Sequence, residues 1–134
     1  MRYLQAMQLS QRIGHERLAR LCYIDYDREI ALVAVRRNPY NHELELMAVG
    51  RITKRISSNT AEFAILVSDR FQHQGIGRVM LRRLIEVARD EQIGTIFATV
   101  LADNVEMLHM VGKFGFNIVD TDSPNLKRAE LKLS

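Results

Sequence analysis

The chain of 134 residues has one cysteine, Cys22, and no tryptophan, and it lacks any long apolar run. A single thiol excludes an intramolecular disulfide, so the fold has to be held together by its core. No segment approaches the roughly 18 apolar residues of a membrane span, and the first residues lack the apolar block of a secretory signal. These absences predict a cytoplasmic protein with no membrane partner.

The net charge is also small, because 19 Lys and Arg against 16 Asp and Glu leave an excess of +3. This excess is too small to predict a nucleic-acid partner, which requires a broad basic face. The chain has 7 Gly, 2 Pro and no internal repeat, so nothing in it marks a linker. We therefore expect one domain over residues 1–134, large enough to bury a core without a metal or a disulfide.

The four histidines show no metal-binding spacing. The His-Glu pairs at 15–16 and 42–43 would need a second histidine at positions 19 and 46 to form a zinc-binding helix. Those positions hold Ala19 and Leu46. We expect no metal site.

Hydrophobic periodicity divides the chain into strands and helices. Apolar residues at intervals of three and four predict a helix from Ser10 to Ile24, and short polar turns then separate three strands of an antiparallel meander. A helix between two strands predicts a parallel pair joined by a crossover. The later elements are expected as strands Ile30–Val35, Glu43–Lys54 and Ala61–Val67, helix Ile76–Arg89, strand Thr95–Val100, helix Asn104–Lys113, and strands Phe116–Asp120 and Leu126–Leu133. The order predicts an α+β fold around a mixed, mostly antiparallel sheet.

The stretch from Val67 to Arg78 leads from a strand end through a glycine-containing turn into a helix. Backbone N–H groups and the positive end of the helix dipole make such a turn an anion site, and glycines at 75 and 77 let an oxyanion reach the main chain. No Gly-Lys-Ser/Thr follows, and Met80 stands where a dinucleotide fingerprint has its third glycine. The turn predicts a diphosphate site, with a plain strand-to-helix turn as the alternative.

Two motifs resemble the GNAT superfamily of N-acetyltransferases. Gln72-His73-Gln74-Gly75-Ile76-Gly77 matches its Gln/Arg-x-x-Gly-x-Gly/Ala coenzyme A signature, and Asn104 opens a predicted helix that ends in Lys-x-Gly-Phe at residues 113–116. The segments 24–35 and 61–64 are similar to the acetyltransferase domain of bacterial protein lysine acetyltransferases, which often occurs fused to an acyl-CoA synthetase-like region.

This resemblance implies a three-layer fold with helices on both faces of the sheet. It also implies direct transfer of an acetyl group from acetyl-CoA to an amine, with protein lysine as the expected acceptor and no covalent enzyme intermediate. The coenzyme contacts that it implies are Leu66, Val67, Gln72, His73, Gln74, Gly75, Ile76, Gly77, Arg78 and Asn104.

Such a transfer needs a neutral amine, and deprotonating a lysine of pKa about 10.4 at pH 7 costs roughly 4–5 kcal/mol. Glu62 is the expected general base, because a glutamate at this strand position has that role in the family. Alternation places Glu62 with Ala64 and Leu66 on one face, where apolar company would raise the pKa of its carboxyl. A solvent-facing structural carboxylate is the alternative. A backbone N–H near Leu66 or Val67 is the expected oxyanion donor.

The acid that protonates the leaving thiolate stays unassigned. Many family members have a tyrosine seven residues after the asparagine, and this chain has Val111 there. Tyr23, Tyr26, Ser68 and His109 are possible substitutes that the spacing does not rank. A thiol of pKa about 8.5 also leaves as thiolate without an acid.

Arg78, Arg82 and Arg83, with Arg89 one turn further, give one side of the helix after the turn a positive charge. They could meet the phosphates of coenzyme A. A solvated helix face explains Arg83 and Arg89 equally well.

Three rival functions remain open. A small-molecule amine acetyltransferase would share the same motifs. A non-catalytic acyl-CoA-sensing domain would keep the diphosphate turn without the base; Glu62 argues against it and the missing tyrosine for it. A nucleic-acid-binding module lacks its aromatic and basic signs.

Relatives in the resembled family open with a strand and a helix before the segment that starts here at Arg2, so the chain is expected to be short at its N-terminus. Without the first strand, Ile30–Val35 would be a sheet edge with unpaired backbone groups, which predicts self-association. The alternative is that Arg2–Gln8 folds back as a substitute strand.

Overall fold

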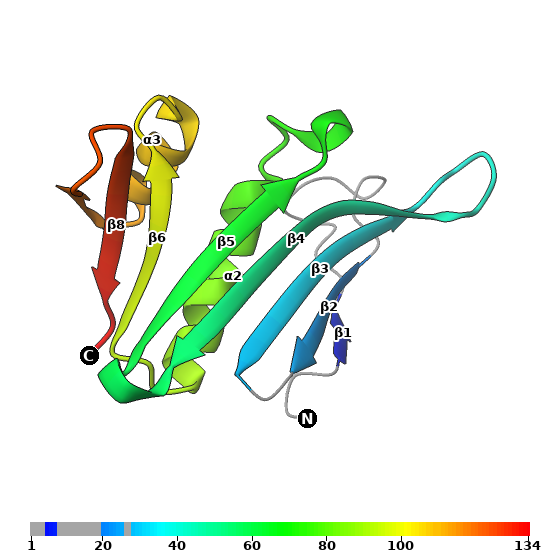
Figure 1. Ribbon diagram of the computed structural model, residues 1–134. Coiled ribbons are helices and arrows are strands. Elements are labelled where there is room, and N and C mark those ends of the chain that lie inside the picture. Colours follow the sequence, from blue (N-terminus) through cyan, green and yellow to red (C-terminus); the bar gives the residue numbers. More distant parts are fainter. Residues whose placement is uncertain (1–4, 8–19, 26–27) are drawn as a thin grey trace.

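The computed structural model describes residues 5–7, 20–25 and 28–134, and these form one eight-stranded sheet (Figure 1). Its strand order is β1-β2-β3-β4-β5-β6-β8-β7. Two α-helices and two short 3₁₀ turns complete the described part. The elements are β1 (Gln5–Met7), β2 (Arg20–Asp25), β3 (Glu29–Arg37), β4 (Leu44–Arg55), η1 (Ile56–Ser58), β5 (Thr60–Val67), η2 (Asp69–Phe71), α2 (Ile76–Asp90), β6 (Thr95–Leu101), α3 (Val105–Lys113), β7 (Asn117–Asp120) and β8 (Leu126–Lys132).

The predicted strand connections are confirmed. β3, β4 and β5 form the antiparallel meander, and β5 pairs in parallel with β6 after the crossover through α2. β8 then lies antiparallel between β6 and β7. The sheet is therefore mixed and mostly antiparallel, as the order of elements predicts.

The helix predicted up to Ile24 is wrong over its last residues. Arg20–Asp25 forms β2, which pairs antiparallel with β3 from Arg20↔Val35 to Asp25↔Ile30. A short apolar run fits both a helix and a strand, and pairing with the neighbouring backbone decides between them. Residues 10–19 of the predicted helix lie outside the described residues.

The expectation that residues 30–35 form a sheet edge is also wrong. This segment lies inside β3, which has β2 on one side and β4 on the other. Gln5–Met7 forms β1, antiparallel to β2. The outer strands of the sheet are β1 and β7. The self-association predicted from an exposed β3 edge therefore no longer follows.

One face of the sheet packs against α2. Leu32, Ile52 and Phe63 share a core with Met80 and Leu84 from the apolar face of this helix. Burial of each such side chain contributes about 1.5–3 kcal/mol. A glycine at position 50 lets the helix pack close, because a Cβ there would lie 3.1 Å from Leu84 Cδ1 and from Met80 Cε.

α3 joins the same core. Its Val111 is fully buried, and Phe116, just after the helix, lies 5.6 Å from Phe63 between ring centroids. Within the described residues both helices thus cover one face, and Figure 1 shows them on the same side of the sheet. The described residues show no helix on the second face, so they do not test the helical layer predicted there. In the described part of the chain, no helix is long and apolar enough to cross a membrane.

Candidate functional site

β5 and β6 separate soon after they start to pair. Their ladder runs only from Thr60↔Thr95 to Glu62↔Phe97, although both strands continue beyond it (Figure 1). After Glu62, no strand among the described residues pairs with β5 on its β6 side. Backbone groups need partners, so this edge can receive an extended ligand as an additional strand.

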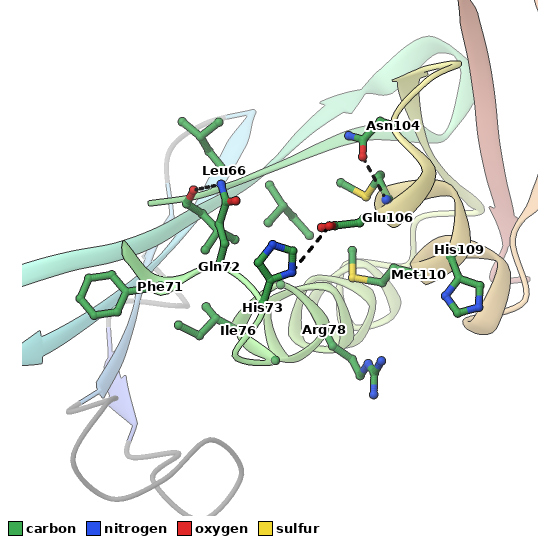
Figure 2. A pocket seen from close by; sticks show the side chains of 15 residues that line it. Leu66, Phe71, Gln72, His73, Ile76, Arg78, Asn104, Glu106, His109 and Met110 are labelled. Carbon is green, nitrogen blue, oxygen red and sulfur yellow. Dashed lines mark hydrogen bonds and ion pairs between the residues drawn. The ribbon is translucent and has the colours of Figure 1, made fainter. Parts of the chain in front are cut away.

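A cleft of about 570 Å³ lies at the end of β5, between the glycine turn and α3 (Figure 2). This volume falls in the range of small-molecule sites. Its lining combines apolar side chains with a few polar groups. The lining residues are Ile65, Leu66, Val67, Phe71, Gln72, His73, Gly75, Ile76, Gly77, Arg78, Asn104, Glu106, Met107, His109 and Met110.

The glycine turn has the backbone conformation of an anion site. His73 and Gly75 have φ of 62° and 83°, in the left-handed region, and Gly75 is the N-cap residue of α2. Gly75 makes no side-chain cap hydrogen bond, and the first N–H groups of a helix have no partner within it. The N–H groups of its first turn are therefore open to a negatively charged group, which the helix dipole also favours.

The space around Gly77 indicates whether the protein's own packing requires a glycine in this turn. A Cβ at this position would lie 3.8 Å from Met110 Sδ and from Val67 Cγ2, which is ordinary contact. The protein's own packing therefore does not require a glycine here. Close approach of a ligand to the main chain does account for it.

Two glutamines of the signature have different surroundings. Gln72 lines the cleft, and its Nε2 donates to the Val67 carbonyl at 3.3 Å and to Asp69 Oδ1 at 3.1 Å, which ties the loop to the end of β5. Gln74 is not among the lining residues. Its Nε2 donates to the Arg70 carbonyl at 3.4 Å, so its side chain supports the loop from behind.

Asn104 both caps α3 and lines the cleft. Its Oδ1 accepts a hydrogen bond from the Met107 N–H at 3.2 Å, as an N-cap residue does. The capping role is thus present, and the same residue faces the space opposite the glycine turn (Figure 2).

The arginines predicted to meet phosphates lie in different places. Arg78 is exposed and lines the cleft. Arg83 instead pairs with Glu86, with Nη1 2.6 Å from Oε2. Arg82 and Arg89 are not among the lining residues. Of this group, only Arg78 can contact a ligand in the cleft.

Glu62 lies at the point where β5 and β6 separate and is not among the lining residues. The predicted alternation is confirmed, because Glu62, Ala64 and Leu66 share the face away from α2, and Leu66 is 76% exposed there. The predicted apolar company is wrong. Glu62 Oε1 lies 3.3 Å from Arg55 Nη2, and the Glu62 side chain is 41% exposed.

The residues considered as acids are also separated. Val111 is fully buried and can donate no proton. His109 lines the cleft, whereas Ser68 is exposed after β5 and is not among the lining residues. The side chains of Tyr23 and Tyr26 lie outside the described residues.

The sequence alone did not identify Glu106 as a cleft residue. It lies in the first turn of α3, with His109 and Met110 three and four positions further. This spacing puts all three on one side of a helix that starts at Asn104, so the helical period was the available signal. Within the described residues, no group of three His, Cys, Asp or Glu could hold a metal ion.

Known proteins are similar to this chain in sequence and in fold. The model of the acetyltransferase (GNAT) family matches residues 3–116. The [ribosomal protein bS18]-alanine N-acetyltransferase of Escherichia coli (strain K12) is 31% identical over 71 residues, which are 53% of this chain and 48% of that protein. The chain spans about half the length of the curated relatives it matches.

Two solved structures show the same fold. The GNAT domain of S. lividans PAT has a TM-score of 0.68 at 23% identity, covering 84% of this chain and 65% of that chain. The structure of yncA from Salmonella typhimurium with acetyl-CoA has a TM-score of 0.64 at 18% identity, covering 79% and 65%. Their strand and helix arrangement is the one described above.

Proposed function

The chain belongs to the acetyltransferase (GNAT) family, and from this premise we propose that it transfers an acetyl group from acetyl-CoA to an amine. One observation carries the proposal. The uncapped first turn of α2 and the unpaired edge of β5 border the same cleft. An anion site next to an open strand edge suits a diphosphate that continues into an extended, amide-containing arm, which is the chemistry of coenzyme A.

The residues present fit this cosubstrate. The N–H groups of Ile76, Gly77 and Arg78 would hold the diphosphate, with the Arg78 guanidinium at the rim. The edge of β5 from Val67 back to Glu62 spans six residues, or about 17 Å from the first to the last, which an extended arm can follow. Its far end is the point where β5 and β6 separate.

Glu62 is the general base in this proposal, because it lies at that point of separation. It removes a proton from the ammonium, directly or through a water, and the freed lone pair forms the new N–C bond. The C–S bond breaks and the thiolate leaves with its electron pair, which needs no acid near neutral pH. The nitrogen then releases its second proton to solvent, which leaves the neutral amide. Backbone N–H groups of Leu66 or Val67 stabilise the carbonyl oxygen as negative charge develops on it.

We further propose a protein lysine as the acceptor and the cytoplasm as the location. Residues 24–35 and 61–64 resemble bacterial protein lysine acetyltransferases, and the fold matches the GNAT domain of S. lividans PAT. A protein N-terminus is the competing acceptor, because the E. coli relative is named for acetylating an alanine of a ribosomal protein. The lone cysteine supports the location.

Mass spectrometry tests activity and acceptor class together. The chain would be incubated with acetyl-CoA and, separately, a lysine peptide with a blocked N-terminus, a lysine-free peptide with a free N-terminal alanine, and a polyamine. The proposal expects a gain of one acetyl group on the lysine peptide, with Glu62→Gln as the inactive control. Transfer only to another acceptor would reject the lysine assignment. Binding of acetyl-CoA with no transfer to any of them would indicate a sensing domain instead.

A further inference from the structure

The face of the sheet opposite α2 carries an aromatic ring beside the proposed base. Glu62, Phe97 and Glu130 are direct neighbours in the ladders of β5, β6 and β8, so their side chains lie in one row on this face. Phe97 is only 3% exposed. Among the described residues, no helix lies over this ring.

Two guanidinium groups cover it. Arg128 lies with Cζ 3.9 Å from the centroid of the Phe97 ring, and Arg55 lies with Cζ 5.2 Å from the same centroid. Both distances are within the range of cation–π attraction. The ring therefore attracts the guanidinium of Arg55 at the end of β4.

Arg55 also contacts the proposed base. Its Nη2 lies 3.3 Å from Glu62 Oε1, so one guanidinium touches both members of the last ladder pair before β5 and β6 separate. Arg128 is engaged elsewhere, because its Nε lies 3.2 Å from Glu130 Oε2. The contact to Glu62 thus comes from Arg55, whose guanidinium also lies near the Phe97 ring.

We propose that Arg55 is a positioning residue that holds the Glu62 carboxylate at the point of strand separation. The inference rests on the proposed function, in which Glu62 is the base. A half-exposed glutamate on an open sheet face has many rotamers, and a base works only when it is held near the proton it removes. The Arg55 guanidinium, which also lies near the Phe97 ring, limits those rotamers through its ion pair with Glu62.

Arg51 provides a matched control. It lies on the same strand and the same face as Arg55, four residues earlier, and is similarly exposed. Its partner is Glu29, with Nη1 3.7 Å from Oε1. Arg51→Met therefore removes an equivalent charge from this face without removing the contact to Glu62.

The test compares steady-state kinetics of Arg55→Met, Arg55→Lys, Arg51→Met, Glu62→Gln and the Arg55→Met/Glu62→Gln double variant, with acetyl-CoA and the blocked lysine peptide. We expect Arg55→Met to lower kcat about 10-fold with an unchanged KM for acetyl-CoA, and Arg55→Lys to recover most of that loss. Arg51→Met should match the wild type. The double variant should be no slower than Glu62→Gln alone, because a residue that acts through Glu62 has no effect once the base is gone.

Two results would overturn the inference while still supporting Glu62 as the base. One is full activity of Arg55→Met together with an impaired Glu62→Gln. The other is a lower kcat in the double variant than in Glu62→Gln alone. Full activity of Glu62→Gln would reject the proposed base, and the inference with it. Arg55 is exposed at a strand end, so its variants should unfold at the wild-type temperature. A lower unfolding temperature of Arg55→Met, with no recovery in Arg55→Lys, would assign Arg55 a structural role.

Discussion

His73 and Glu106 meet across the cleft, with imidazole Nδ1 3.6 Å from carboxylate Oε1 (Figure 2). His73 belongs to the glycine turn and Glu106 to the first turn of α3. Both side chains are largely exposed. The pair therefore joins the two walls of the cleft and places a negative charge on the lining of a site proposed to hold a diphosphate.

This charge predicts the effect of Glu106→Gln. Removing a carboxylate from the wall of an anion site should strengthen acetyl-CoA binding about 2- to 5-fold, and more at low than at high salt because the groups are exposed. Titration calorimetry at two salt concentrations measures it. Asp103→Asn is the control, since Asp103 is exposed near the same helix end but does not line the cleft. Weaker binding of Glu106→Gln would show that the bridge to His73 matters more than the charge.

Gly77→Glu and Gly75→Glu should each abolish acetyl-CoA binding. Each adds a side chain and a negative charge where the diphosphate is proposed to approach the main chain. Gly77→Ala is the control for folding, because the Cβ that it adds would make only ordinary contacts of 3.8 Å within the protein. Calorimetry on folded protein decides the matter, and unchanged affinity in Gly77→Glu would exclude this turn as the diphosphate site.

Glu62→Gln should lower kcat by about 10²- to 10⁴-fold and leave the affinity for acetyl-CoA nearly intact, because a general base acts in the transition state. Part of the rate should return at high pH, where more of the acceptor amine is already neutral. A pH series of initial rates measures both effects. Wild-type turnover at pH 7 would mean that Glu62 is structural.

The Glu45 carboxyl should make the free energy of unfolding depend on pH in the acid range. A hydrogen bond from Asn38 Nδ2 at 2.6 Å, and then the nearby guanidinium groups of Arg36 and Arg70, hold the pKa of its carboxyl below the ordinary 4.5, against the opposing effect of burial. A carboxyl with a lowered folded-state pKa stabilises the fold above its unfolded-state pKa and loses that contribution as the pH falls through the folded-state value.

Glu45→Gln should therefore lower the free energy of unfolding at pH 7, and the difference from the wild type should shrink below pH 4.5. Urea unfolding at a series of pH values measures this difference. Because Arg70 Nη1 lies 2.8 Å from Glu45 Oε2 and precedes the glycine turn, weaker acetyl-CoA binding should accompany the loss. A difference that stays constant down to pH 3 would exclude the titration of Glu45 as its cause.

The sequence by itself determined the parts of the fold that depend on neighbours along the chain. The alternation in Ala61–Val67, the helical period of α2, the glycine turn at residues 72–77 and the cap at Asn104 are local, because backbone preference and side-chain spacing act over a few residues. These features were enough to indicate the family and most of the cleft lining. The same local signals do not separate a short apolar strand from a helix, so the helix predicted up to Ile24 is wrong over residues 20–24.

Only the tertiary structure decided which distant residues meet. Pairing with β3 made residues 20–25 a strand, the early separation of β5 from β6 opened the edge after Glu62, and packing of α3 beside the glycine turn brought Glu106 to His73. Arg55 reached Glu62 and Phe97 in the same way. Such contacts depend on ladder register and on how helices pack against the sheet, and these result from the burial of the whole core rather than from any local pattern.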